Sequence, residues 1–179
     1  MNGTMRVFIS VEVPEEIREK AARLAEELPK DAVRPVKPEN MHLTLRFVGE
    51  IPKDAVDRVK KKLGEVKFSP FVAKFRGVGV FPSENYVRVV WVGVESEELL
   101  SLASEVKNAM KGEKGDERFS AHLTIARVKR KIDARGFLEK HRNDEFGEFE
   151  IKSFELMQSK LQPGKPPEYT IIASFPAVE

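Results

Sequence analysis

The chain has 179 residues, of which 41% are hydrophobic and 34% are charged, with 31 Lys and Arg against 29 Asp and Glu. This length and apolar content suit one ordinary domain, or two small lobes that share a core, and they exclude global disorder. The net charge of +2 argues against a protein that coats nucleic acid by charge alone, and the absence of cysteine excludes disulfides, thiolate metal sites and cysteine nucleophiles.

The first third of the chain alternates predicted strands and helices. Residues 6–13 are β-branched and aromatic, which is typical of a buried strand. Residues 14–29 begin with a proline and two glutamates and continue with apolar residues at helical spacing, which predicts an amphipathic helix. Residues 41–48 alternate in polarity and predict a second strand, and residues 56–63 predict a second helix.

The rest of the chain continues this pattern. Residues 68–80 and 86–94 predict two strands around a turn-rich connection, 96–110 a third helix, and 119–128 another strand. The remaining predicted elements are a short helix over 133–141 and closing strands over 149–159 and 169–175. The pattern indicates an α+β fold with antiparallel sheets and outer helices. No linker-like segment divides the two similar parts, so we expect residues 1–179 to form one domain of two lobes.

One tetrapeptide occurs twice. His-Leu-Thr-Leu at 42–45 recurs, 80 residues later, as His-Leu-Thr-Ile at 122–125. Alternation along a strand places each histidine on the same face as the threonine two residues later, roughly 6–7 Å away. An imidazole exchanges a proton near neutral pH, and a hydroxyl donates to an anionic oxygen. A single copy is typical of an ordinary half-buried strand, but core packing gives no reason to repeat both polar residues.

Two facing copies would supply an acid, a base and two donors to an oxyanion. This set suits in-line displacement at phosphorus, in which one imidazole deprotonates the nucleophile and the other protonates the leaving oxygen. A metal site that uses both histidines is a weaker alternative, because neither motif adds a carboxylate or a thiolate ligand.

The paired motifs resemble the 2H phosphoesterase superfamily, specifically its LigT-like branch of RNA 2′,3′-cyclic phosphodiesterases, also called 2′-5′ RNA ligases. The resemblance extends to the segments 38–50, 119–127 and 169–176 and spans essentially the whole chain. It implies a bilobal, pseudo-twofold fold in which two antiparallel sheets face a central cleft.

The resemblance also implies roles for the four motif residues. His42 matches the proton donor to the departing 3′ oxygen, and His122 matches the acceptor that activates water. Thr44 and Thr124 match residues that hold the phosphoryl oxygens. The implied reaction opens an RNA 2′,3′-cyclic phosphate to a 2′-phosphomonoester without a metal or other cofactor. Its reverse, with a 5′-hydroxyl RNA end as the nucleophile, is 2′-5′ ligation.

Five further residues are candidates for substrate binding. Arg46 shares the predicted face of the first motif and could neutralise phosphate or solvate the rim of the cleft. Phe47 and Arg127 each follow their histidine by five residues and match a pair that sandwiches the terminal base. Strict alternation turns both away from the histidines, so this role requires a bulge; otherwise Phe47 belongs to the core and Arg127 to a surface ion pair. Arg130 belongs to a basic cluster that could contact RNA phosphates or form an ordinary charged loop, and Tyr169 lines the cleft or packs against it.

We expect a cytoplasmic monomer whose partner is RNA with a 2′,3′-cyclic phosphate end, tRNA-like fragments being one candidate. No signal-type or membrane-spanning stretch occurs in the sequence, and the low Gln content with abundant Glu, Lys and Arg resembles that of thermophile proteins. Two alternatives stay open: a phosphodiesterase for a small cyclic nucleotide, such as ADP-ribose 1″,2″-cyclic phosphate, and a non-catalytic module that binds RNA ends.

Overall fold

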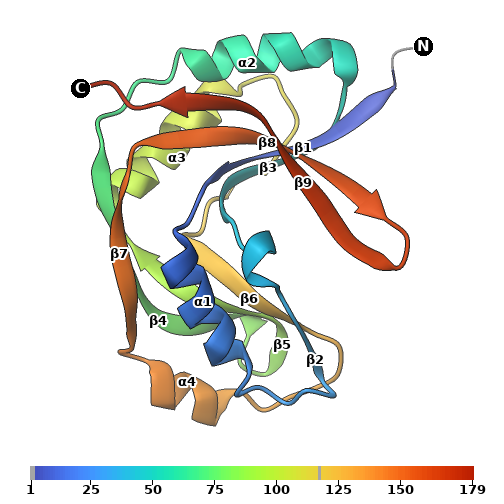
Figure 1. Ribbon diagram of the computed structural model, residues 1–179, viewed down its shortest axis with the longest axis vertical. Helices are drawn as coiled ribbons and strands as arrows, with labels where there is room; N and C mark the ends of the chain where they lie inside the picture. The colour runs from blue at the N-terminus through green and yellow to red at the C-terminus, as the bar shows by residue number, and fades with distance from the viewer. Residues whose placement is uncertain (1–2, 117) are drawn as a thin grey trace.

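The computed structural model describes residues 3–116 and 118–179, which form two antiparallel sheets with helices against them (Figure 1). The four-stranded sheet has the order β3–β1–β8–β9, and the five-stranded sheet has the order β2–β6–β5–β4–β7. The strands of the first are β1 (Thr4–Val11), β3 (Leu43–Pro52), β8 (Ser153–Gln162) and β9 (Lys165–Pro176). Those of the second are β2 (Val33–Pro35), β4 (Phe71–Ser83), β5 (Tyr86–Glu95), β6 (His122–Val128) and β7 (Glu145–Ile151). The predicted α+β class is confirmed.

Two of the helices, α1 and α3, pack against the sheet to which the strand before them does not belong. The helix bounds are Glu15–Ala25 for α1, Val56–Gly64 for α2, Glu97–Ala109 for α3 and Arg135–His141 for α4. Although α1 follows β1 of the four-stranded sheet, it packs against β6 and β7 of the other. Conversely, α3 follows β5 of the five-stranded sheet and reaches β3 of the first. Because β2 also pairs with β6, the two halves of the chain interleave.

Local sequence explains where the helices begin. The side chain of Ser96 accepts a hydrogen bond from the backbone N–H of Leu99 at 3.1 Å and caps α3, whose first turn carries two glutamates. The first helix ends at Ala25 rather than near Pro29, yet Leu28 beyond it is still buried. Apolar spacing therefore predicted the buried face of this segment correctly but overestimated the length of its helix.

The prediction of one continuous strand over residues 149–159 is wrong. The chain instead leaves β7 of the five-stranded sheet at Ile151 and enters β8 of the four-stranded sheet at Ser153. Local composition does not reveal this crossing, because both segments favour strands. The short strand β2 was not predicted either, since it is an edge strand that ends in Pro35.

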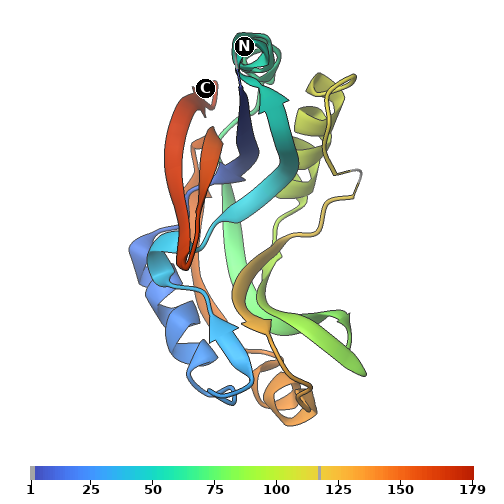
Figure 2. The same cartoon turned by 90° about the vertical axis from the view of Figure 1, so that its right-hand side faces the viewer.

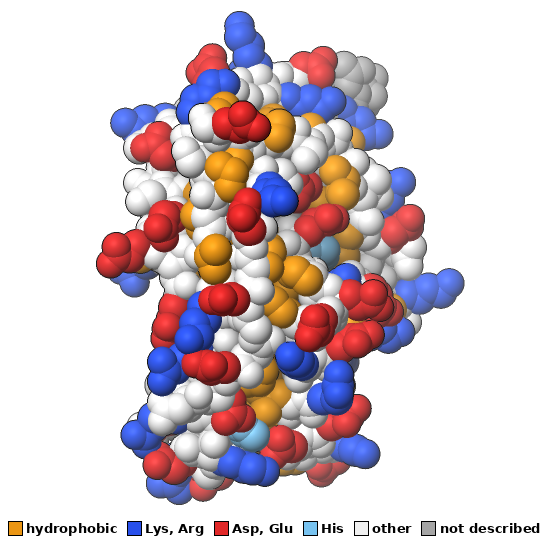
Figure 3. All heavy atoms as spheres, turned by 60° about the vertical axis from the view of Figure 1, so that its left-hand side comes forward, with side chains coloured by type: hydrophobic (Ala, Val, Ile, Leu, Met, Phe, Trp, Pro, Cys, Tyr) orange, Lys and Arg blue, Asp and Glu red, His pale blue; other side chains and the backbone are white. Residues whose placement is uncertain are grey.

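Most of the apolar residues that face between the layers are fully buried, among them Ile9, Leu43, Phe75, Leu123 and Phe154. On the face seen in Figure 3, acidic and basic side chains are interspersed around a strip of hydrophobic ones, in keeping with the near-balance of charge in the sequence. No helix in the described part of the chain is long and apolar enough to cross a membrane.

The strands that carry the two motifs approach each other although they belong to different sheets. Cα atoms of β3 and β6 come within 8 Å of one another. Two long hairpins, β8–β9 from one sheet and β4–β5 from the other, extend beyond these strands (Figure 2). The fold thus brings the two repeated tetrapeptides into one region of the molecule.

Candidate active site

A β-bulge at Leu45 determines which side chains share a face with the first motif. Ser10 of β1 pairs with Thr44, and Ile9 pairs with Arg46, which leaves Leu45 as an extra residue on β3. Neighbouring residues on β1 face opposite sides of the sheet, so their partners Thr44 and Arg46 do so as well. The prediction that Arg46 lies on the histidine face is therefore wrong, because strict alternation does not hold across the bulge.

The second motif contains the same irregularity at the same position. Trp91 of β5 pairs with Thr124, and Val90 pairs with Ala126, which leaves Ile125 as the extra residue. Leu45 and Ile125 are each the fourth residue of their motif. The duplication therefore includes the local backbone distortion as well as the residue types.

The two bulges return the fifth residue after each histidine to the motif face. Phe47 pairs with Phe8, whose ring centroid lies 6.3 Å from that of Phe47 and 5.5 Å from that of His42. Arg127 pairs with Val89, which shares its face of β5 with the partner of Thr124. Phe47 is 52% exposed, so its interpretation as a core residue is wrong. Both side chains lie on the motif face, and the base contact predicted for them stays a prediction.

His42 lies in an aromatic pocket. The ring centroid of Tyr169 is 4.7 Å from that of His42, in an edge-on arrangement, and Phe8 completes the cluster. Burial, aided by the positive charge of Arg18, lowers the pKa of His42 to about 4. Its Nε2 atom is buried and finds no hydrogen-bond partner among the residues that the structure describes. This imidazole is thus neutral in the free protein, with one nitrogen that lacks a protein partner.

His122 is held by its own strand and by two aromatic rings. Its Nδ1 lies 2.8 Å from the carbonyl oxygen of Ser120. A carbonyl only accepts, so Nδ1 carries the proton and Nε2 keeps its lone pair. The ring centroids of Phe81 and Trp91 lie 5.0 and 6.1 Å away. Burial lowers the pKa of His122; the Ser120 carbonyl opposes this shift, and the charge of Arg127 adds to it.

The positive charge of Arg127 affects the pKa values of two groups, one near each motif. Its charge lowers the pKa of His122 and also acts on Tyr169, whose phenol pKa is raised by burial and lowered in part by Arg127. Since Tyr169 contacts the ring of His42, one guanidinium on β6 lies within electrostatic reach of groups at both motifs. The charge of Arg127 therefore acts on a group in the second motif and on a neighbour of the first.

Comparison with known proteins now bears on this site. The family model described as LigT like Phosphoesterase matches the chain twice, over residues 11–91 and 92–167, and each match contains one motif. The chain belongs to the LigT-like phosphoesterase family. The two matches divide the chain into two successive sequence units, and each sheet contains strands from both units.

Three similar proteins illustrate the relationship. An RNA 2′,3′-cyclic phosphodiesterase from Archaeoglobus fulgidus is 43% identical over 167 residues, which cover 90% of this chain and 95% of the relative. The crystal structure of TT0787 of Thermus thermophilus superimposes with a TM-score of 0.79 at 31% identity, covering 96% of this chain and 97% of that one. E. coli LigT complexed with 3′-AMP gives a TM-score of 0.81 at 23% identity over 99% of this chain and 100% of that one, a likeness of fold alone.

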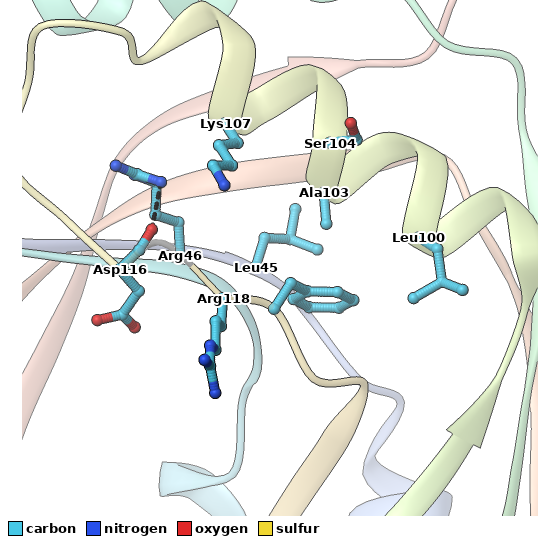
Figure 4. Close-up of a pocket in the computed structure, with 9 residues that line it drawn as sticks. Leu45, Arg46, Leu100, Ala103, Ser104, Lys107, Asp116 and Arg118 are labelled. Carbon is cyan, nitrogen blue, oxygen red and sulfur yellow. Dashed lines mark hydrogen bonds between the residues drawn. The ribbon is translucent and has the colours of Figure 1, made fainter.

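In this LigT-like protein Arg46 binds a loop rather than the motif face. Its side chain is buried, and Nη1 donates to the carbonyl oxygen of Asp116 at 2.5 Å (Figure 4). A Cβ at Gly115 would lie 2.5 Å from Nε of Arg46, so the loop backbone packs directly on the guanidinium. The N–H of Asp116 in turn donates to the carbonyl of Phe47 at 3.0 Å. Arg46 also lines a pocket of about 240 Å³ between β3 and α3.

The same loop is anchored a second time, on α2. The Glu113 carboxylate lies 2.8 Å from Arg58 Nε and 2.9 Å from Lys62 Nζ. Hydrogen bonds from Arg58 and then Lys62 lower the pKa of Glu113 to about 2. This loop leads directly to the second motif, so the first half of the chain holds the segment from which His122 emerges.

Arg130 lies beyond the end of β6 on an exposed stretch, 4.0 Å from a carboxylate oxygen of Asp31. None of the contacts found in the described part of the chain joins it to either histidine. The contact with RNA that we predicted for its basic cluster stays a prediction.

Several residues around the histidines were not singled out from the sequence. Phe8, Phe81 and Trp91 all contact a histidine ring, and Ser120 fixes the tautomer of His122. Alternation within residues 6–13 could have placed Phe8 opposite the first motif once the pairing of β1 with β3 was known, but the pairing itself is a long-range property.

The third histidine lies apart from this site. His141 is buried, with Nδ1 2.6 Å from Asp144 Oδ2 and Nε2 3.2 Å from Glu27. It thereby joins α4 to the end of α1. Across residues 3–116 and 118–179, no group of three or more His, Cys, Asp and Glu side chains is placed to hold a metal ion.

Proposed function

We propose that this LigT-like phosphoesterase hydrolyses RNA 2′,3′-cyclic phosphate ends to 2′-phosphomonoesters by acid–base catalysis with His42 and His122. The observation that carries the proposal is the identical placement of His and Thr before the same bulge on two strands that approach each other. The relatives support the reaction, since proteins up to 43% identical are named RNA 2′,3′-cyclic phosphodiesterases.

In the proposed reaction, water attacks phosphorus while the bond to the 3′ oxygen breaks. Nε2 of His122 accepts the proton of the attacking water, a role that suits the nitrogen left unprotonated when Nδ1 donates to Ser120. His42 gives a proton to the departing 3′ oxygen. Thr44 and Thr124 donate to the phosphoryl oxygens, whose charge develops during the displacement. His122 takes up one proton and His42 gives one up, so the proton transfers balance without a metal ion.

The charge of the substrate supplies what the free protein lacks. Burial leaves His42 neutral at pH 7 when the site is empty, because its pKa is about 4. A phosphodiester anion next to the ring favours the imidazolium and raises this pKa. Substrate binding thus favours protonation of His42, which then serves as the proton donor.

Phe47 and Arg127 are proposed to hold the terminal base between an aromatic ring and a guanidinium. Both are exposed and lie on the motif face. Stacking of this kind is worth roughly 1–3 kcal/mol per base and tolerates different bases. Tyr169 packs against His42 and orients its ring from the other side. Arg130 and its basic neighbours are proposed to contact RNA phosphates outside the site.

The same residues can ligate when another nucleophile takes the place of water. With a 5′-hydroxyl RNA end in place of water, His122 would deprotonate the nucleophile that attacks a cyclic phosphate, and a 2′-5′ linkage would form. We further propose that residues 1–179 act as a monomeric single domain in the cytoplasm, because one chain supplies every residue of the site and its halves interleave.

The test is turnover of a short RNA with a 2′,3′-cyclic phosphate end by the wild-type protein in EDTA. We expect a product that carries phosphate at the 2′ position, which ³¹P NMR distinguishes from a 3′-phosphate. Binding of the RNA without any turnover would favour a non-catalytic module that recognises RNA ends.

A further inference from the structure

The site face of the five-stranded sheet continues past the residues used above. On β5, Trp91 and Val89 pair with Thr124 and Arg127 of β6 and share their face. Trp91 lies so flat on this face that a Cβ at Gly79 of β4 would collide with its ring. Because β5 and β6 are antiparallel, a path from His122 toward Arg127 leads along β5 toward the tip of the β4–β5 hairpin.

A third bulge brings Tyr86 onto this face. Phe81 pairs with Val89, but the next residue of β4 pairs with Val87, which leaves Arg88 as an extra residue. Consecutive residues of β4 face opposite sides, so Val87 turns to the core, where it is 6% exposed. Tyr86, the next residue toward the tip, therefore returns to the face of Phe81 and Val89.

Tyr86 is an open platform on this face. It is 60% exposed, and Cζ of Arg88 lies 5.8 Å from the centroid of its ring. A single exposed aromatic side chain is ordinary in itself. Tyr86 differs because an arginine accompanies it, as one does at the base contact of Phe47 and Arg127, and because its face is continuous with His122 through Phe81.

We propose that Tyr86 and Arg88 bind the penultimate nucleotide of the RNA, which precedes the terminal nucleotide that carries the cyclic phosphate. From Val89, which neighbours Arg127, to Tyr86 is about 7–10 Å along the strand, at roughly 3.3 Å per residue. If the terminal base lies at Arg127, the penultimate base is within reach of the ring of Tyr86. The charge of Arg88 complements the phosphodiester between the two nucleotides. A single cyclic mononucleotide fills only the first position.

This inference rests on the proposed function and selects among its substrates. It implies that single-stranded RNA is the preferred substrate, because a small cyclic nucleotide does not reach the additional contact at Tyr86. Stacking on tyrosine tolerates different bases, so the preference is for an additional nucleotide and not for a particular sequence.

The experiment compares kcat/KM for adenosine 2′,3′-cyclic monophosphate and for the dinucleotide ApA with a 2′,3′-cyclic phosphate end. We expect the wild type to favour the dinucleotide, and Tyr86→Ala to lower the ratio of the two constants roughly 5- to 50-fold. Tyr86→Phe, which keeps the ring, should retain the ratio. Leu161→Ala on the β8–β9 hairpin, where Leu161 is 68% exposed, is the matched control and should change neither constant.

A dinucleotide whose 5′ residue lacks its base provides a second measurement. Its advantage over the mononucleotide should shrink in the wild type to what the charge of Arg88 contributes at the phosphodiester, and Tyr86→Ala should then lower kcat/KM no further. An unchanged ratio in Tyr86→Ala, with both substrates turned over, would overturn this inference and leave the proposed function standing. If the wild type turns over neither substrate, the proposed function fails and this inference with it.

Discussion

Replacing Arg46 by methionine tests whether this residue holds the loop before the second motif. The change keeps most of the side-chain volume and removes the hydrogen bond to the carbonyl of Asp116. A hydrogen bond from a charged donor contributes about 1.5–3 kcal/mol to stability. For a chain of this size each kcal/mol corresponds to about 2–4 °C, so we expect the melting temperature to fall by about 3–12 °C. The loop would then hold His122 less firmly, and kcat should fall more than KM rises.

Calorimetry and steady-state turnover of a cyclic-phosphate RNA measure the two effects. Arg135→Met is the matched control, because Arg135 is exposed and paired locally with Asp133, and its loss should leave the melting temperature essentially unchanged. A raised KM in Arg46→Met without a change in melting temperature would refute the reasoning. That result would restore the interpretation of Arg46 as a phosphate ligand.

Two further predictions concern the site itself. Burial lowers the pKa of His42 to about 4 and also lowers that of His122, so the optimum of kcat/KM should lie on the acid side of neutrality. Activity should fall toward higher pH as the donor loses its proton and toward lower pH as the acceptor gains one; an optimum above pH 7 would contradict the two roles. Phe47→Ala should lower kcat/KM for any terminal base roughly 5- to 100-fold while Phe47→Trp retains it, and a loss confined to one base would speak against stacking.

The sequence predicts the elements of this fold well where local patterns decide them. The strand around Ile9, the buried face of the helix that starts after Pro14, and the cap at Ser96 all follow from residue spacing and type. The pairing of strands does not, because it depends on contacts between distant segments. Nothing in residues 145–162 indicates that the chain leaves one sheet at Ile151 and joins the other at Ser153.

The candidate site shows the same division. The four histidine and threonine residues of the motifs could be found by inspection, since the same tetrapeptide pattern occurs twice in the sequence. The sequence does not show which face of the sheet Arg46 and Phe47 occupy. The extra residue Leu45 turns Arg46 away from the motif face and Phe47 onto it, and this bulge is visible only in the pairing with β1. The buried position of His141 likewise involves Glu27, more than a hundred residues away, and the charged sequence around His141 does not indicate this contact.

Interleaving of the two halves explains how a duplicated sequence can make one site. Each half contributes one motif, yet β2 pairs with the second motif strand, and the loop that precedes His122 is held by Arg46 and α2 of the first half. The first half therefore stabilises the strand that carries the second motif and the loop before it. We expect neither to place its histidine correctly when expressed alone.

The most direct test of the central claim is the turnover of a cyclic-phosphate RNA by His42→Ala and His122→Ala in EDTA, with circular dichroism to confirm the fold. Each substitution removes one proton-transfer partner, and we predict that each lowers kcat by roughly 10²–10⁴-fold. The double variant should lose little more, because the two imidazoles act as one unit. Activity close to that of the wild type in either folded single variant would contradict the assignment of the paired histidines as acid and base.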